Sequence, residues 1–291
     1  METAPEYLTV KELAELLRIK ERKVYDLAAS GQVPVSRATG KLLFPESEVR
    51  AWIDGNRSGP GERPARPSVL LGSHDPLLEW AVRQSECGLA TLLDGSSDGL
   101  TRFCAGEGVA AGMHIHDAAS EAWNVPVVKA KAAGQDAVLL SWARRRRGIV
   151  MSPDKSNAIH LLSDLKGRRL VARQAASGTA VLFGHLLHAA GISKDDIDFA
   201  ATARSEQDAV LAVAEGAADA TFGLEALAKP YGLTFLPLVE ESFDLLVDRH
   251  AYFEPPMQGL LEFCKGPEFA ERAKGLGGYS VTDLGKVRWT A

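Results

Sequence analysis

Apolar positions in the first 54 residues recur at helical spacing in three short segments. The first begins with a capping box, in which Thr9 caps the helix and Glu12 follows three residues later. Gly31 and Pro34 end the second segment, because glycine suits a helix terminus and proline cannot continue the helix. The predicted elements are helices over 9–17, 21–29 and 45–53, with a short hairpin over 35–44. This order is typical of a winged helix-turn-helix.

Residues 55–67 are rich in glycine, proline and charge and have no periodicity, which indicates a linker between residues 1–54 and a second domain over 68–291. In that domain short apolar runs alternate with helical patterns. The runs predict strands over 69–71, 89–93, 109–115, 137–142, 148–151, 170–172, 219–223 and 234–238, with helices over 76–85, 99–105, 180–187, 206–214 and 225–229. Such alternation indicates an α/β fold with a mostly parallel sheet.

One strand-to-helix junction carries the strongest chemical signal. Arg173 ends an apolar run, and Ser177, Gly178 and Thr179 open the next helix. The first backbone N–H groups of a helix lack partners within it and its dipole is positive there, so this junction suits an anion. Arg173 adds a fork of N–H donors. An ordinary helix cap is the alternative, since serine and threonine are common caps.

Two other junctions share this small, hydroxyl-bearing character. The first contains Ser73 and His74, and the second contains Ser96 and Ser97. In open α/β sheets ligands bind beyond the carboxyl ends of the strands, where such junctions meet. We therefore expect three helix N-termini to converge on one small anion.

Several other residues of the second domain could have a functional role, and we interpret each of them separately. His114 and His116 fall on one face of a strand, but no additional cysteine or histidine pattern supports a metal, and we expect none. His116, at the strand end, is a candidate ligand contact instead. The four arginines at 144–147 are interpreted as a solvated turn between two strands. No nucleophile elbow surrounds Ser177, so we expect no enzyme activity.

Composition restricts the cellular compartment and the binding partners that we expect for this protein. The chain has 291 residues, no stretch of about 20 apolar residues and no signal-peptide pattern, which predicts no membrane span. Its three cysteines lie far apart and suit the reducing cytoplasm. The net charge is −5 overall, but residues 1–67 carry eleven Lys/Arg and ten Asp/Glu, so this end is slightly basic. A basic end on an acidic protein is compatible with DNA contact.

The first 54 residues resemble the excisionase and MerR-type DNA-binding module. The resemblance rests on residues 7–17, 24–25, 31–34 and 44–53. It implies that the second helix enters the major groove of DNA while the wing contacts the backbone. The DNA-facing residues implied are Lys20, Arg22, Lys23 and Tyr25 on the helix, with Arg37 and Lys41 on the wing.

The second domain resembles the type II periplasmic-binding-protein fold, especially molybdate- and tungstate-binding proteins. Residues 95–100, 105–114, 147–150, 165–179 and 216–220 carry this resemblance. It implies two lobes, about 68–150 with 243–291 and about 151–242, with chain crossings near 150–153 and 238–243. The oxyanion would be held by neutral donors of the three junctions, with Arg173 as the charged partner. Asp75 departs from the family pattern, because a carboxylate beside an oxyanion is repulsive unless it points away or is protonated.

These observations predict a cytoplasmic transcription regulator that binds double-stranded DNA and senses a small oxyanion, with no other cofactor. A single small module makes few DNA contacts, so we expect a dimer or higher homo-oligomer. The alternative is a cytoplasmic enzyme or binding protein on the same two-lobed fold that acts on a small anionic metabolite.

Overall fold

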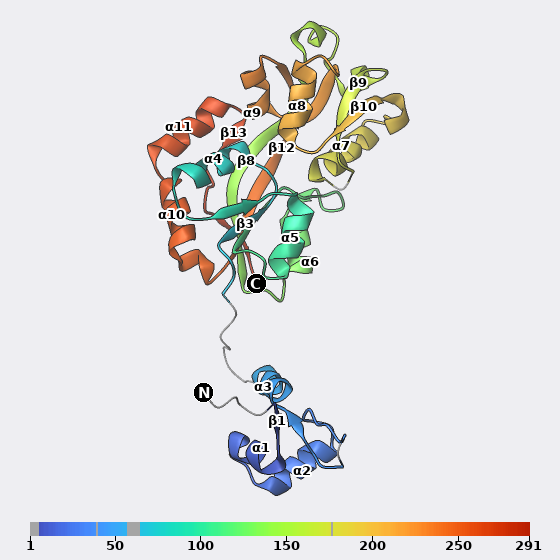
Figure 1. The fold of residues 1–291 in the computed structure, drawn as a ribbon. Coiled ribbons are helices and arrows are strands. Elements are labelled where there is room, and N and C mark those ends of the chain that lie inside the picture. Colours follow the sequence, from blue (N-terminus) through green and yellow to red (C-terminus); the bar gives the residue numbers. More distant parts are fainter. Residues whose placement is uncertain (1–5, 39, 57–64, 176) are drawn as a thin grey trace. The chain divides into compact units, whose positions relative to one another are not determined.

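The computed structural model describes residues 6–38, 40–56, 65–175 and 177–291. The chain divides into two compact units, Met1–Ala65 and Arg66–Ala291 (Figure 1). Most of the predicted linker, and residue 39 at the centre of the predicted hairpin, lie outside the described residues.

The N-terminal unit contains three helices and a two-stranded sheet among its described residues. They are β1 (Tyr7–Leu8), α1 (Val10–Leu17), α2 (Glu21–Ala29), β2 (Phe44–Pro45) and α3 (Glu46–Gly55). The capping box predicted for α1 is present, with the Thr9 side chain accepting from the Glu12 backbone and the Glu12 carboxylate accepting from Thr9. Leu13, Val24, Phe44 and Val49 are fully buried and form the centre of a small core.

The predicted hairpin is shorter than expected. Among the described residues of that segment, one antiparallel bridge joins Ser36 to Leu43, and the next residue, Phe44, pairs with Leu8 of β1 instead. Between the two bridge residues, the Gly40 N–H donates to the Arg37 carbonyl at 3.1 Å. The helix-turn-helix plan is unaffected, because α1, α2 and the core keep their predicted places.

The second unit is built on one sheet of ten described strands. Its strand order is β10-β9-β11-β8-β12-β5-β3-β4, with β13 and β14 also paired to β8. The first lobe contains β3 (Val69–Gly72), α4 (Pro76–Gln84), β4 (Ala90–Leu92), α5 (Ser96–Cys104), β5 (Ala110–Met113), β6 (His116–Asp117), β7 (Ala122–Trp123), α6 (Val125–Lys131), α10 (Pro255–Phe263), α11 (Pro267–Leu276), β13 (Tyr279–Ser280) and β14 (Val287–Thr290). The second lobe contains β9 (Arg169–Arg173), α7 (Gly178–Ala189), β10 (Asp198–Ala203), α8 (Glu206–Ala214), β11 (Ala220–Leu224) and α9 (Glu225–Ala228).

Two long strands, β8 (Ala137–Met151) and β12 (Thr234–Asp248), run through both lobes and pair with each other antiparallel. Short 3-10 helices complete the unit at Pro153–Lys155, Leu162–Leu165, Lys194–Asp196, Lys229–Tyr231 and Ala251–Phe253. Figure 1 shows α4, α10 and α11 on one face of the first lobe's sheet, and α5 with α6 on the other. The predicted α/β fold class with two lobes is thus confirmed, but the expectation of a mostly parallel sheet is wrong. The long strands β8 and β12 pair antiparallel with each other, and β11, β13 and β14 pair antiparallel with β8, as does β5 with β12.

The interpretation of residues 144–147 as a solvated turn is wrong. They lie in the middle of β8 and join the two strands that we predicted separately. Side chains alternate along a strand, so Arg144 and Arg146 are exposed while Arg145 and Arg147 are buried. β8 passes from one lobe to the other here, since Arg145 pairs with β13 and Arg147 with β11. The first crossing therefore precedes the expected position at 150–153.

Candidate ligand-binding site and DNA-binding surface

A cavity of about 410 Å³ lies in the second unit, with walls from both lobes. The first lobe contributes the ends of β3 and β5 and the start of α5, and the second contributes the end of β9 and the starts of α7 and α8. The cavity is lined by Ser73, His74, Leu93, Asp94, Gly95, Ser97, Asp98, His114, Arg173, Gln174, Ser177, Gly178, Thr179, Arg204, Ser205 and Glu206. Residues of all three junctions therefore line the same cavity.

Two of the candidate ligand residues lie elsewhere. Ser96 is buried, and its hydroxyl accepts from the His114 backbone N–H at 3.0 Å, so it fixes β5 against α5. His116 is outside the cavity lining, where its ring contacts Trp123 with a centroid separation of 4.9 Å. Within the described part of the chain, no group of His, Cys, Asp and Glu side chains is arranged to hold a metal ion.

Three of the hydroxyl groups in the cavity lining, those of Ser73, Ser177 and Thr179, already have protein partners. Ser177 caps α7 by accepting from the Ala180 N–H at 3.1 Å, as the ordinary-cap interpretation holds. Thr179 donates to Glu206 Oε1 at 2.6 Å. Ser73 lies 3.0 Å from His114 Nε2. Burial lowers the pKa of His114, which favours the neutral ring.

Arg173 differs from these hydroxyls because most of its donors are unused. Its Nη2 donates to the Arg204 carbonyl at 2.9 Å, but Nε and Nη1 are buried and have no hydrogen-bond partner. Burial, with a further contribution from Arg147, lowers the pKa of Arg173. Buried donors are almost always paired in native proteins, so the unpaired guanidinium donors of the cavity wall are available to the acceptor atoms of a ligand.

Asp75 does not face the cavity. Its Oδ1 accepts from the Leu78 N–H at 2.6 Å and caps α4, while Oδ2 accepts from Arg145 at 2.8 Å and from the Tyr279 hydroxyl at 2.5 Å. Asp75 is fully buried and absent from the lining. The repulsion that this residue would create beside an oxyanion therefore does not arise.

A buried ion network behind the cavity was missed from the sequence. Glu241 of β12 accepts from Arg147 at 2.9 and 3.0 Å and lies 2.5 Å from Arg145. Arg147 also donates to Glu206 at 2.7 Å and to Thr179 at 3.2 Å. Burial alone would raise the pKa of Glu241, but the two arginines hold it well below its usual range. The network thus connects the cavity wall to the strands that join the lobes.

A signal for this network was present in the sequence. Alternate arginines in a run flanked by apolar residues fit a strand with one buried face, and Glu240–Glu241 supplies the complementary pair in the second long strand. The sequence did not indicate that Glu206 joins this network, because a glutamate in the first turn of a helix is common.

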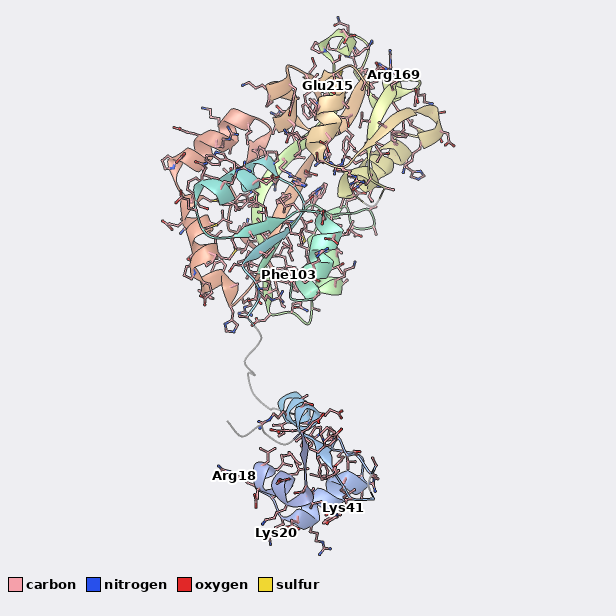
Figure 2. The ribbon with its side chains drawn as sticks, viewed as in Figure 1. Arg18, Lys20, Lys41, Phe103, Arg169 and Glu215 are labelled. Atoms are coloured by element: carbon pink, nitrogen blue, oxygen red, sulfur yellow. The ribbon has the colours of Figure 1, made fainter. Side chains whose placement is uncertain are left out.

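The candidate DNA-facing residues are all exposed on the N-terminal unit: Lys20, Arg22, Lys23, Tyr25, Arg37 and Lys41. Lys20 is the residue before α2, and Figure 2 shows it and Lys41 at the surface of this unit. Arg37 donates to the Ala28 carbonyl at 3.1 Å, which ties the wing to the end of α2. Four of the six side chains thus belong to α2 and its N-cap.

The fold and the site define a class of protein, a two-lobed binding domain that follows a helix-turn-helix module. A model of the PBP superfamily domain matches residues 78–265, more than half of the chain, and a helix-turn-helix domain model matches residues 7–57. The chain belongs to the PBP superfamily. Its N-terminal helix-turn-helix implies DNA binding, and the combination fits a regulator that is not an enzyme.

An uncharacterised protein, YvgK of Bacillus subtilis (strain 168), is 24% identical over 299 residues, which cover 96% of each chain. Two solved structures share the fold of the second unit at TM-score 0.51. One is a tungstate ABC transporter protein from Geobacter sulfurreducens, with 14% identity over 70% of this chain and 95% of its own. The other is a candidate phosphate ABC transporter substrate-binding protein from Clostridium perfringens, with 12% identity over 76% and 99%. No described helix is long and apolar enough to span a bilayer.

Proposed function

We propose that this protein is a cytoplasmic transcription regulator that senses a small oxyanion. The N-terminal module binds DNA, and the anion binds in the cavity between the lobes of the second unit. The observation that carries the proposal is Arg173, whose Nε and Nη1 are buried in the cavity wall without partners. An oxyanion supplies acceptors for both groups.

The surroundings of Arg173 support the same ligand class. The N-termini of α5, α7 and α8 all contribute residues to the cavity lining. Helix N-termini present backbone N–H groups and a positive dipole end, which favour anions. The resemblance noted in the sequence makes molybdate and tungstate the first candidates. The cavity is larger than a single such ion, and closure of the lobes on the ligand would reduce it.

The DNA-binding part of the proposal rests on the exposed basic residues of α2 and its N-cap. We propose a homodimer that reads two half-sites, because one small module contacts few base pairs. The anion regulates transcription if it favours one DNA-binding arrangement over another.

The test is calorimetry on the full chain with molybdate, tungstate, phosphate and sulfate. Arg173→Ala removes a charge-assisted contact and should weaken binding of the anion that wild type prefers about ten- to a hundredfold. Arg83→Ala, which removes an exposed arginine of α4, should bind as wild type does. The oxyanion site is wrong if wild type binds none of the four, or if Arg173→Ala binds as tightly as wild type.

A further inference from the structure

We propose that Ser73 is an acylation site, at which the chain takes an acyl group from an anionic acyl donor such as an acyl phosphate. The inference rests on the proposed function in its choice of donor, because the cavity assigned to the anion also contains this serine. The carrying observation is a row of three neighbouring side chains, in which His114 lies between Ser73 and the buried carboxylate of Glu241.

Ser73 is the member of this row that a ligand can reach and attack. It follows β3, is half-buried and lines the cavity. Its backbone N–H donates to the Gly112 carbonyl of β5 at 2.8 Å. Gly72 has a φ of +108°, and a Cβ there would lie 2.1 Å from the Gly112 oxygen, so this turn requires glycine. The close approach of β3 and β5 therefore fixes the position of Ser73.

His114, the residue after β5, lies where the Ser73 hydroxyl needs a base. Its Nε2 is 3.0 Å from Ser73 Oγ, and its Nδ1 is 3.1 Å from Glu241 Oε2. A carboxylate beside Nδ1 favours the tautomer with its proton on that nitrogen, which leaves the Nε2 lone pair for the hydroxyl. The ring is 4% exposed, and burial lowers the pKa of His114, so the ring is neutral and able to accept a proton at neutral pH.

Glu241 supplies the negative charge that the proton transfer needs. Burial alone would raise its pKa, but Arg145 and Arg147 hold the pKa well below its usual range, so the carboxylate is ionised. It stabilises the imidazolium that forms when His114 takes the serine proton. This stabilisation is electrostatic, since Nδ1 is off the line of a hydrogen bond to the carboxylate. A hydroxyl, an imidazole and a carboxylate in this order make serine a nucleophile.

The start of α7 lies against the same histidine. A Cβ at Gly178 would be 3.3 Å from His114 Cε1 and 3.3 Å from the His114 carbonyl oxygen. Gly178 and Thr179 line the cavity together with Ser73. The first N–H groups of a helix have no partner within it, so they can stabilise the negative charge that develops on an acyl oxygen under attack.

The rest of the cavity indicates the class of acyl donor. Arg173 contributes unpaired guanidinium donors, which bind an anionic group. The cavity volume of about 410 Å³ leaves room for an acyl group beside an oxyanion. An acyl phosphate combines a phosphate for Arg173 with an acyl carbon for Ser73, whereas a neutral ester lacks the group that Arg173 would bind.

The reaction is a transfer without oxidation or reduction. The Ser73 oxygen forms a bond to the acyl carbon while its proton passes to His114 Nε2. The bond between the acyl carbon and the phosphate oxygen breaks, and its electron pair stays on that oxygen, which then takes the proton from His114. The products are a serine ester and hydrogen phosphate. Each chain takes one acyl group, so the reaction modifies the regulator and is not a catalytic cycle.

The experiment incubates the full chain with acetyl phosphate at pH 7.5 and follows the intact mass and the modified peptides by mass spectrometry. We expect one acetyl group per chain, located on Ser73, and its loss in Ser73→Ala. Ser85→Ala is the matched control and should react as wild type does, because this half-buried serine of the same lobe donates to the Val82 carbonyl at 3.2 Å. His114→Gln should slow acetylation of Ser73 about a hundredfold, since it removes the positioned base.

Three results would overturn the inference: no acetyl group on Ser73 of wild type, equally fast acetylation of Ser97, or a wild-type rate at Ser73 in folded His114→Gln. Ser97 is the internal reference because it is an exposed serine of the same cavity. If His114→Gln fails to fold, the sites modified in wild type decide. The calorimetry with oxyanions separates the two proposals. Anion binding without acetylation overturns this inference alone, whereas acetylation of Ser73 in a chain that binds no oxyanion overturns the proposed function.

Discussion

Asp244 is a carboxylate that the fold holds in an unfavourable environment. It is fully buried in β12, where Oδ2 accepts from Asn124 at 2.8 Å and Arg288 lies 3.5 Å from Oδ1. Burial outweighs both contacts and raises its pKa to about 6. A raised pKa means that the folded state favours the protonated form, so stability from this group falls as the pH rises from about 4 to 6.

Asp244→Asn should therefore stabilise the protein at neutral pH. The amide keeps an acceptor for Asn124 without a buried charge, and the gain should be about 1–3 kcal/mol at pH 7.5 and vanish near pH 4. Unfolding by urea at several pH values measures this. The difference in the free energy of unfolding between wild type and Asp244→Asn reports the titration of Asp244 alone, because all other groups titrate in both proteins. Parallel stability curves would contradict the prediction.

At the scale of elements, β8 and β12 carry one buried and one exposed set of charge pairs. Glu241 is fully buried among Arg145 and Arg147, whereas its neighbour Glu240 pairs with Arg144 at 3.1 Å on the surface. Removing one partner of a buried network leaves uncompensated charge, but exposed pairs contribute little.

Glu241→Ala should thus destabilise the protein by about 3–5 kcal/mol. The matched control, Glu240→Ala on the same strand, should cost less than about 1 kcal/mol. Denaturant unfolding of both variants measures the contrast. Similar losses for the two would show that the buried network contributes no more than surface pairing.

The second helix gives a separate prediction for DNA. Arg22→Ala with Lys23→Ala should weaken binding to DNA from upstream of the protein's own gene and lower the salt dependence by about one phosphate contact for each residue. Lys11→Ala in α1 is the control, and anion binding should stay at the wild-type level. If the double variant shows the same dependence of DNA affinity on salt concentration as wild type, α2 does not contact DNA.

Local patterns and long-range partners differ in how far the sequence reveals them. The bounds of α2 and the caps of α1 and α4 follow from residues within a few positions of each other. The environment of Arg145 and Arg147 depends instead on Asp75, Glu206 and Glu241, which come from distant segments. Charge runs are usually solvated, so the burial could be found only by pairing the two long strands first.

The same distinction applies to the cavity. Ser73, Ser97 and the residues 177–179 were found because strand-to-helix junctions have a recognisable composition. Whether a hydroxyl is free for a ligand depends on its neighbours, and Ser96 and Ser177 are used by the protein. The unpaired atoms of Arg173 and Glu206 are visible only once the walls are assembled.

For the whole molecule, regulation requires that the anion and DNA influence each other's affinity. If the anion changes DNA affinity by some factor, DNA must change anion affinity by the same factor, and typical coupling is about 5–150-fold. Titrating the full chain with DNA with and without saturating anion, and then the reverse, measures both factors. If neither ligand changes the affinity for the other, the protein binds an anion but its cavity does not control the DNA-binding module.

The two long strands have a consequence for how the protein is made. β8 gains its central partner only when β12 has been synthesised, and the whole second lobe lies between them in the chain. Contacts so distant in sequence form slowly and late. The helix-turn-helix core, in contrast, uses only residues before position 56. On the proposed function, a message truncated before Thr234 would therefore encode the complete helix-turn-helix core without the second long strand, so its product could bind DNA but could not respond to an anion.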